Sequence, residues 1–186
     1  MSTRIRFTTQ DLELLPRPLD DTRYEIIDGE LHVSTQPHVR HQFASGQIAT
    51  VLAMWDEQSG LGITLPAPGV IFSPDNNVAP DIIWVRRERL EGLLDEGGHL
   101  TAAPELMVEV LSPGSANERR DRELKLALYS RQGVSEYWIV DWRERTVQVY
   151  RREQDELRLA ATLSGDDLLT SPLLPGFVCP ITRFWL

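Results

Sequence analysis

Lys125 is the only lysine in a chain of 186 residues, in which the other 18 basic side chains are arginines. It lies in residues 118–132, which have the pattern of an amphipathic helix. At about 100° per residue, one face of this helix carries Asp121, Leu124, Lys125, Leu128 and Gln132. A lysine that points with leucines toward the interior needs acidic partners, because a buried ammonium group is rarely tolerated alone. The alternative is a surface lysine that survived by drift.

A second charged residue, Glu109, stands inside the apolar run Leu106-Met107-Val108-Glu109-Val110-Leu111. Such a run predicts a central strand that is buried on both faces, with Glu109 on the same side as Met107 and Leu111. Burying an ionised carboxylate without a partner is costly. We therefore expect Glu109 to pair with a cation, to bind a metal ion or to act in catalysis.

Two further carboxylates occupy unusual positions. Asp81 follows Pro80 and opens the apolar stretch 82–85, so it can lean into a cleft at the end of a sheet. A turn or capping aspartate is the structural alternative. Glu25 lies among apolar residues of a first strand, where it either faces inward or alternates outward to solvent.

These carboxylates and one inward lysine suit a metal-dependent hydrolase. Two or three carboxylate ligands with open coordination positions favour Mg²⁺ or Mn²⁺. The single cysteine, Cys179, and the absence of clustered histidines disfavour zinc. Lys125 beside such an ion could orient a water molecule, help to deprotonate it, or stabilise a pentavalent phosphoryl transition state. The combination predicts phosphodiester hydrolysis.

The bulk composition is that of an ordinary globular protein, with 41% hydrophobic and 25% charged residues. The net charge of −9 argues against broad non-specific nucleic-acid binding, although it leaves a local basic groove open. No stretch has the pattern of a signal peptide or approaches the roughly 20 apolar residues that cross a bilayer. We therefore expect a single cytoplasmic domain over residues 1–186, without membrane contact and with an N-terminal arm over 1–20.

The elements that would position the charged residues mix strands with helices. Hydrophobic patterns predict a hairpin over 24–34 with Asp28-Gly29 as its turn, and helices over 37–59, 86–94 and 118–132. Further strands are expected over 60–72, 81–85, 105–111, 136–141, 146–151 and 157–163, whereas 172–180 is expected to be irregular. This order predicts an α/β domain with a mixed sheet flanked by helices.

Several stretches, taken in order, resemble the Uma-type family of restriction-endonuclease-like proteins in the PD-(D/E)XK nuclease superfamily. The matching motifs are Tyr24-Glu25-Ile26-Ile27-Asp28-Gly29-Glu30, Pro80-Asp81, Glu109-Val110-Leu111-Ser112-Pro113, Arg120-Asp121 with Lys125 and Tyr129, residues 133–141 and residues 169–177. Each motif alone is weak, but their order and spacing are fairly specific. The resemblance extends from about residue 20 to the C-terminus.

The resemblance implies a restriction-endonuclease-like core, a mixed central sheet flanked by helices, with the N-terminal hairpin beside it. It implies Asp81 and Glu109 as ligands of Mg²⁺ or Mn²⁺, Lys125 as the catalytic lysine and Glu25 as a supporting catalytic acid. One feature departs from the superfamily pattern, because the usual acid-x-lysine spacing would place lysine at position 111, which is Leu111. The family places its lysine on the following helix, where the face argument independently finds Lys125.

Two other residues are candidates for supporting roles. Asp121 lies four residues before Lys125 and could orient it, or form an ordinary helix salt bridge. His41 lies on the core face of the helix over 37–59. A metal pair with His38 is less expected than a helix-entry histidine followed by a packed core histidine.

Two hypotheses for the function follow. The first is a metal-dependent endonuclease that hydrolyses DNA as a homodimer or higher homo-oligomer, since double-strand cleavage needs two sites. The second is a non-catalytic interaction or assembly module on a nuclease-like fold, in which Lys125 and Glu109 form a structural pair. The acidic charge and the leucine at position 111 motivate the second.

Overall fold

The computed structural model describes residues 5–15 and 22–186, so residues 1–4 and 16–20 of the predicted N-terminal arm over 1–20 lie outside the described residues. Within that arm, residues 9–14 form helix α1 (Thr9–Leu14). A capping box stabilises its first turn, in which the Thr8 side chain accepts from the Asp11 amide and the Asp11 side chain accepts from the Thr8 amide.

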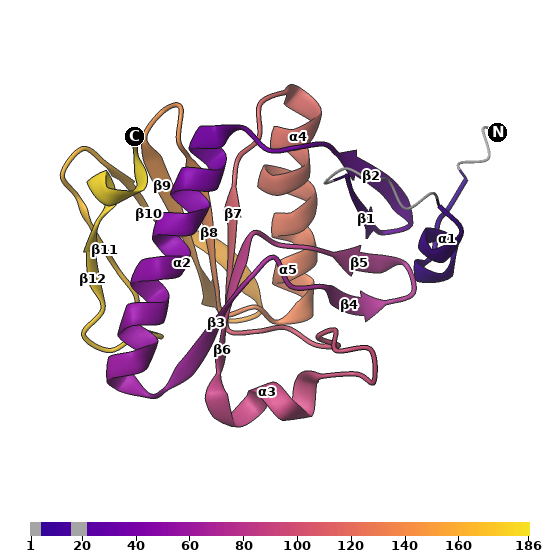
Figure 1. Cartoon of the computed structure of the whole chain (residues 1–186), viewed down its shortest axis with the longest axis horizontal. Helices are drawn as coiled ribbons and strands as arrows, with labels where there is room; N and C mark the ends of the chain where they lie inside the picture. The colour runs from indigo at the N-terminus through magenta and orange to yellow at the C-terminus, as the bar shows by residue number, and fades with distance from the viewer. Residues whose placement is uncertain (1–4, 16–21) are drawn as a thin grey trace.

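A mixed six-stranded sheet forms the centre of the molecule (Figure 1). Its strands run in the order β10 (Glu156–Ser164), β9 (Thr146–Glu153), β8 (Glu136–Asp141), β7 (Leu106–Val110), β6 (Ile82–Arg86) and β3 (Gly62–Pro66). Only the β7–β8 pair is parallel among these neighbours. β7 is buried along its whole length, as its apolar run predicts.

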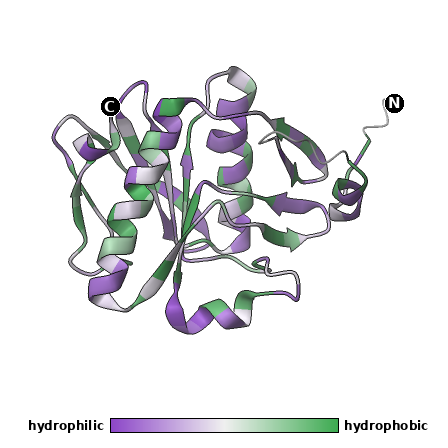
Figure 2. Cartoon of the chain, in the orientation of Figure 1, coloured by the Kyte–Doolittle hydropathy of each residue, from purple (hydrophilic) through white to green (hydrophobic). Residues whose placement is uncertain are grey.

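Helices cover both faces of this sheet. Helix α2 (Val39–Ser59) packs its buried residues Ala44, Ile48 and Leu52 on one face. The opposite face is covered by the helical segment 115–132, which buries Leu128 and Tyr129. The helix residues that pack on the sheet are hydrophobic, and Figure 2 shows hydrophobic and hydrophilic residues alternating along both helical segments. The short helix α3 (Arg87–Leu93) follows β6. This arrangement confirms the predicted α/β fold with a mixed sheet between helices.

A second, four-stranded sheet lies beside the helical segment (Figure 1). Its order is β2 (Glu30–Ser34), β1 (Arg23–Ile27), β5 (Asn76–Val78) and β4 (Val70–Ser73). The predicted hairpin turn is confirmed, since Asp28 and Gly29 both have positive φ, as a two-residue type I′ turn requires. β5 was not predicted, because three residues with two asparagines carry no alternating apolar signal.

The predicted helix over 118–132 begins earlier and is irregular. α4 (Ser115–Arg119) leads into a π-helical turn (Arg120–Lys125), and α5 (Leu126–Gln132) completes the segment. In a regular α-helix, residues five apart point about 140° away from each other. A π-turn bonds residue i to i+5 and brings such residues close to the same side. Arg120 and Lys125, five apart, are both buried here.

The expectation that residues 172–180 are irregular is wrong at their end. Residues 178–180 form β12 (Val178–Pro180), which pairs with β11 (Leu168–Thr170) as a small two-stranded sheet. Several prolines mask this pairing in the sequence. A 3₁₀ turn (Ile181–Phe184) then returns the chain to the core. Across the described residues, none of the helices is both long and apolar enough to span a membrane.

Candidate active site

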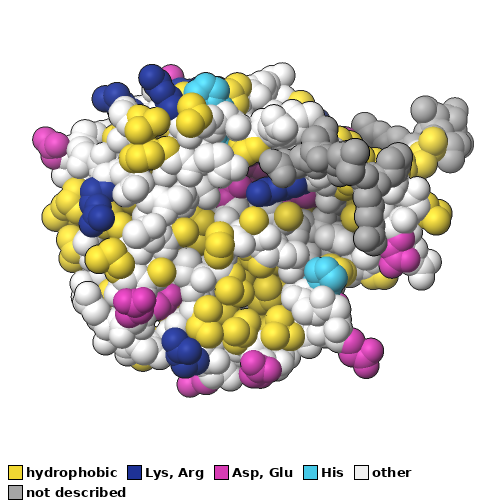
Figure 3. All heavy atoms as spheres, in the orientation of Figure 1, with side chains coloured by type: hydrophobic (Ala, Val, Ile, Leu, Met, Phe, Trp, Pro, Cys, Tyr) yellow, Lys and Arg dark blue, Asp and Glu magenta, His cyan; other side chains and the backbone are white. Residues whose placement is uncertain are grey.

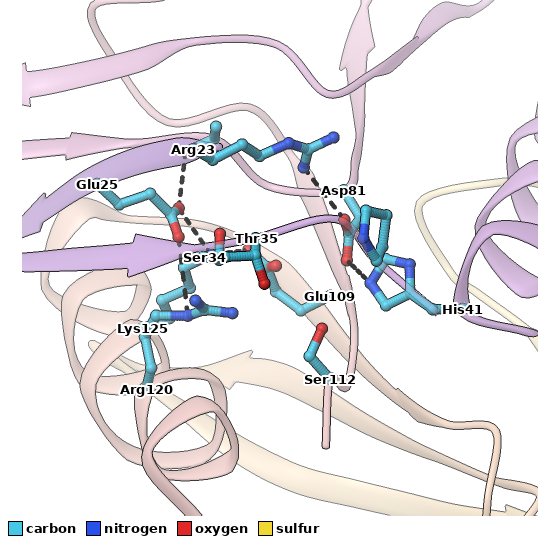
Figure 4. A pocket seen from close by; sticks show the side chains of 12 residues that line it. Arg23, Glu25, Ser34, Thr35, His41, Asp81, Glu109, Ser112, Arg120 and Lys125 are labelled. Carbon is cyan, nitrogen blue, oxygen red and sulfur yellow. Dashed lines mark hydrogen bonds and ion pairs between the residues drawn. The ribbon is translucent and has the colours of Figure 1, made fainter. Parts of the chain in front are cut away.

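A small cavity lies where the four-stranded sheet, α2, the ends of β6 and β7, and the π-turn meet (Figure 4). Its volume is about 30 Å³, which is space for one or two water molecules. The lining includes Arg23, Glu25, His41, Asp81, Glu109, Arg120 and Lys125, together with Ser34, Thr35, Pro37, Ala79 and Ser112. In the space-filling view, acidic and basic side chains meet in a recess above the central sheet (Figure 3). The four predicted catalytic residues and His41 therefore converge, although they come from five separate segments.

Lys125 projects from the π-turn into this cavity and is 1% exposed. Its Nζ lies 2.8 Å from Oε1 of Glu25 and 2.8 Å from Oε1 of Glu109. Burial lowers the pKa of Lys125, but the charges of Glu109 and Glu25 outweigh it and raise the pKa above its usual value. The amino group therefore stays protonated and donates hydrogen bonds. The inward orientation deduced from the helical pattern is correct.

Glu109 is fixed on the side of β7 that faces the helical segment. Its Oε1 also accepts a hydrogen bond from the Tyr129 hydroxyl at 2.8 Å. Within the described part of the chain, no donor reaches its Oε2. Burial raises the pKa of the Glu109 carboxyl to about 8, against the opposing charge of Lys125. Negative charges from three neighbours, Asp121, Asp81 and Glu25, also raise it.

Removing the Tyr129 hydroxyl should destabilise the protein. Burial and the charge of Glu109 raise the pKa of Tyr129 well above its usual value, so the hydroxyl stays a donor. Leaving a buried group without its hydrogen-bond partner costs about 1–3 kcal/mol, and Tyr129→Phe should lower the free energy of unfolding by that amount. Urea denaturation measures it, with Tyr150→Phe on the half-buried β9 as control. Equal losses of unfolding free energy in the two variants would show that the hydrogen bond to Glu109 does not stabilise the protein.

Asp81 stands directly before β6. In the antiparallel register of β6 and β7, Ile82 pairs with Val108, so the next pair outward is Asp81 with Glu109. Oδ2 of Asp81 accepts hydrogen bonds from the backbone amide of Val110 at 2.8 Å and from Nε2 of His41 at 3.2 Å. Burial alone would raise the pKa of Asp81, but these two groups and Lys125 lower it below its usual value. Asp81 is thus an ionised carboxylate held against the end of the sheet.

Glu25 reaches the cavity from β1 of the second sheet. Its Oε1 accepts hydrogen bonds from the Ala79 amide and from Lys125, both at 2.8 Å. Burial raises the pKa of Glu25, yet Lys125 and Arg120 lower it overall. Of the two orientations left open by the sequence, Glu25 therefore takes the inward one.

Asp121 forms the i,i+4 ion pair with Lys125 that was considered as an alternative, but the pair is buried and is not an exposed helix salt bridge. Its carboxylate accepts two hydrogen bonds from Arg120, at 2.8 and 3.2 Å, whereas Lys125 lies 3.8 Å away. Arg120 also lies 3.7 Å from Glu25. Asp121 thus anchors Arg120, which the sequence did not single out because a regular helix would turn it away from Lys125.

His38 and His41, at the start of α2, do not form a metal pair. His38 precedes the helix, accepts a hydrogen bond from the Arg40 amide and stacks on Trp142 at 4.7 Å. His41 is buried against Asp81, and its Nδ1 has no partner among the described residues. These positions match the expected helix-entry histidine and packed core histidine.

The charges around the cavity are unbalanced. Within the described part of the chain, four buried carboxylates, Glu25, Asp81, Glu109 and Asp121, face two buried cations, Arg120 and Lys125. Burial and this excess of carboxylates raise the pKa of Glu109, and a cation that bound here would favour the ionised form of its carboxyl. No three His, Cys, Asp or Glu side chains of residues 5–15 and 22–186 converge to enclose an ion by themselves.

Comparison with known proteins identifies a solved structure with a similar fold and the family to which the chain belongs. A crystal structure described as a putative nuclease belonging to DUF820, from Anabaena variabilis ATCC 29413, matches with a TM-score of 0.75 and 20% identity. The match covers 96% of this chain and 97% of that one, and it confirms the expected nuclease-like α/β fold. The chain belongs to the Uma2 family, described as "Putative restriction endonuclease", whose model matches residues 9–182. No curated protein matches the chain.

Proposed function

We propose that this protein is a Mg²⁺- or Mn²⁺-dependent endonuclease that hydrolyses DNA phosphodiester bonds. One observation carries the proposal: the ammonium group of Lys125 is held 2.8 Å from both Glu25 and Glu109, in a cavity that Asp81 also lines. Membership of a family described as putative restriction endonucleases supports the same chemistry.

The residues fit a divalent ion held by Asp81 and Glu109. Mg²⁺ is commonly bound by one or two carboxylates, with water and substrate phosphates completing its coordination. Two neighbouring carboxyl groups without a third protein ligand among the described residues suit that mode, and the surplus of buried carboxyl groups over cations favours it. When bound, the ion would polarise the phosphodiester and lower the pKa of a bound water molecule.

The protein groups then have separate roles. Lys125 stays protonated, so it orients a water or stabilises negative charge rather than accepting a proton. Glu25 and Glu109 fix the position of the Lys125 amino group between them. On the other side, His41 and the Val110 amide both bind Oδ2 of Asp81, which leaves Oδ1 turned toward the cavity and Arg23. Asp121 supports the site through Arg120.

Removal of the metal ion tests the proposal directly. Purified protein is incubated with supercoiled plasmid and with single-stranded DNA in Mn²⁺, with and without EDTA. We expect nicked or linear products that EDTA abolishes and fresh Mn²⁺ restores. Cleavage that persists in EDTA would contradict a metal-dependent mechanism, and no cleavage of either DNA with Mn²⁺ or Mg²⁺ would contradict the nuclease.

The non-catalytic module is the second candidate. The observation in its favour is the closed network around Lys125, in a cavity of about 30 Å³ that is too small for a phosphodiester with its nucleosides. A nuclease must therefore widen this site when DNA binds. A structural module would leave it closed, and it would bind no Mn²⁺.

The proposed reaction also bears on assembly and location. Cleavage of both DNA strands requires two active sites, so we infer a homodimer that acts on DNA in the cytoplasm. Sedimentation of the protein with and without duplex DNA would reveal the number of chains. A monomer in both conditions would restrict the proposed activity to nicking or to single strands.

A further inference from the structure

Three cations line the cavity, and they differ in how accessible they are. The side chains of Lys125 and Arg120 are 1% and 8% exposed, whereas that of Arg23 is 38% exposed. Lys125 is held by two short ion pairs, and Arg120 donates two hydrogen bonds to Asp121. Of these three, Arg23 is therefore the cation that a group arriving from solvent can reach first.

Arg23 is only loosely bound within the protein. It begins β1 and extends across the cavity toward Asp81 (Figure 4). Its Nη1 lies 3.5 Å from Oδ1 of Asp81, at the outer limit of a hydrogen bond. Oδ2 of Asp81 already accepts two shorter bonds, from Val110 and His41. A guanidinium group has five N–H donors in a planar fork, and this long contact with Asp81 is the one ion pair of Arg23 among the side chains of residues 5–15 and 22–186, so most of its capacity is unused among them.

We propose that Arg23 binds a non-bridging oxygen of the scissile phosphate, an inference that rests on the proposed nuclease function. The Arg23 guanidinium lies 3.5 Å from Oδ1 of Asp81, so a phosphate drawn to an ion that Asp81 would hold can also reach the guanidinium. The planar guanidinium group can donate two parallel hydrogen bonds to a phosphate, whereas a lysine offers only a point charge.

Arg23 would also reduce the electrostatic repulsion between the acidic protein and DNA. The protein carries a net charge of −9, and the cavity wall is rich in carboxylates. A DNA phosphate that approaches this wall is repelled, and a cation at the entrance offsets the repulsion. Lys125 acts from the buried side of the cavity and Arg23 from its exposed side, so the phosphate is held between them.

The test compares Arg23→Gln and Arg23→Lys with the wild type in two measurements. Single-turnover cleavage of DNA in Mn²⁺ reports the phosphate contact, and calorimetric Mn²⁺ titration without DNA reports the metal site. We expect Arg23→Gln to cleave about 100-fold more slowly, as for loss of one transition-state donor. Arg23→Lys should recover part of the rate, because it keeps the charge but loses the fork. The control is Arg158→Gln, an exposed arginine of β10.

The Mn²⁺ titration separates this role from a structural one. If Arg23 binds phosphate, Arg23→Gln keeps the wild-type Mn²⁺ affinity or increases it, because a positive charge next to Asp81 is removed. Loss of Mn²⁺ binding in Arg23→Gln would overturn the inference, since it would make Arg23 a support for Asp81. Wild-type cleavage rates in Arg23→Gln would overturn it while leaving the nuclease intact. A wild type that cleaves no DNA would overturn both proposals together.

Discussion

Asp81→Asn is expected to weaken Mn²⁺ binding by more than about 100-fold and to abolish DNA cleavage, while the protein stays folded. The surroundings of Asp81 lower its pKa, so the wild-type carboxylate is ionised at neutral pH and offers a full charge to the ion. Asparagine removes that charge but keeps an oxygen that can accept the hydrogen bond from the Val110 amide. Calorimetric Mn²⁺ titration and thermal unfolding of the same preparations measure both effects.

A matched control for this variant lies outside the cavity. Asp56 is 7% exposed and accepts hydrogen bonds from the Trp84 and Thr64 side chains. Asp56→Asn should lose stability through these bonds and leave Mn²⁺ affinity unchanged. If Asp81→Asn binds Mn²⁺ as the wild type does, Asp81 is not a metal ligand.

The sequence predicted the inward-facing residues of this site where the pattern of one helix or one strand was enough to show which side chains face the interior. The α-helical repeat that places Lys125 among leucines remains a good guide, and it also places His41 on the core face of α2. Tyr129, four residues after Lys125, could have been found by the same argument, since residues four apart share a helix face. The apolar run around Glu109 likewise predicted its burial.

What the sequence did not predict depends on geometry between distant segments. The approach of Asp81 to Glu109 is set by the register of β6 against β7, which no local pattern reveals. Arg120 joins the site only because the helix contains a π-turn, and its sequence has no breaker that announces one. Arg23 becomes important only once β1 is placed across the cavity from Asp81. Strand β5 ends directly before Ala79, whose amide donates a hydrogen bond to Glu25. The sequence of β5 has no hydrophobic pattern that predicts a strand.

Lys125→Met is expected to abolish cleavage and to lower the free energy of unfolding by about 3–5 kcal/mol, the cost of stranding buried charges. Lys125 connects Glu25 of the second sheet with Glu109 of the central sheet. Without the ammonium group, Glu25 and Glu109 stay buried without the donor that they share, and the pKa of Glu109 rises further because Lys125 no longer lowers it. A loss of stability therefore follows from either hypothesis, catalytic or structural, and stability alone does not separate them.

A double-mutant cycle with Glu109→Gln isolates the contribution of the pair. Because the two side chains are in contact, the doubly substituted protein should lose less stability than the sum of the single variants, by about 0.5–3 kcal/mol. Urea denaturation of the four proteins gives this coupling free energy. Additive losses would show that Lys125 and Glu109 do not stabilise each other. If the Lys125→Met single variant stays folded and binds Mn²⁺ and duplex DNA yet cleaves nothing, the lysine is needed for the reaction as well as for the connection between the sheets.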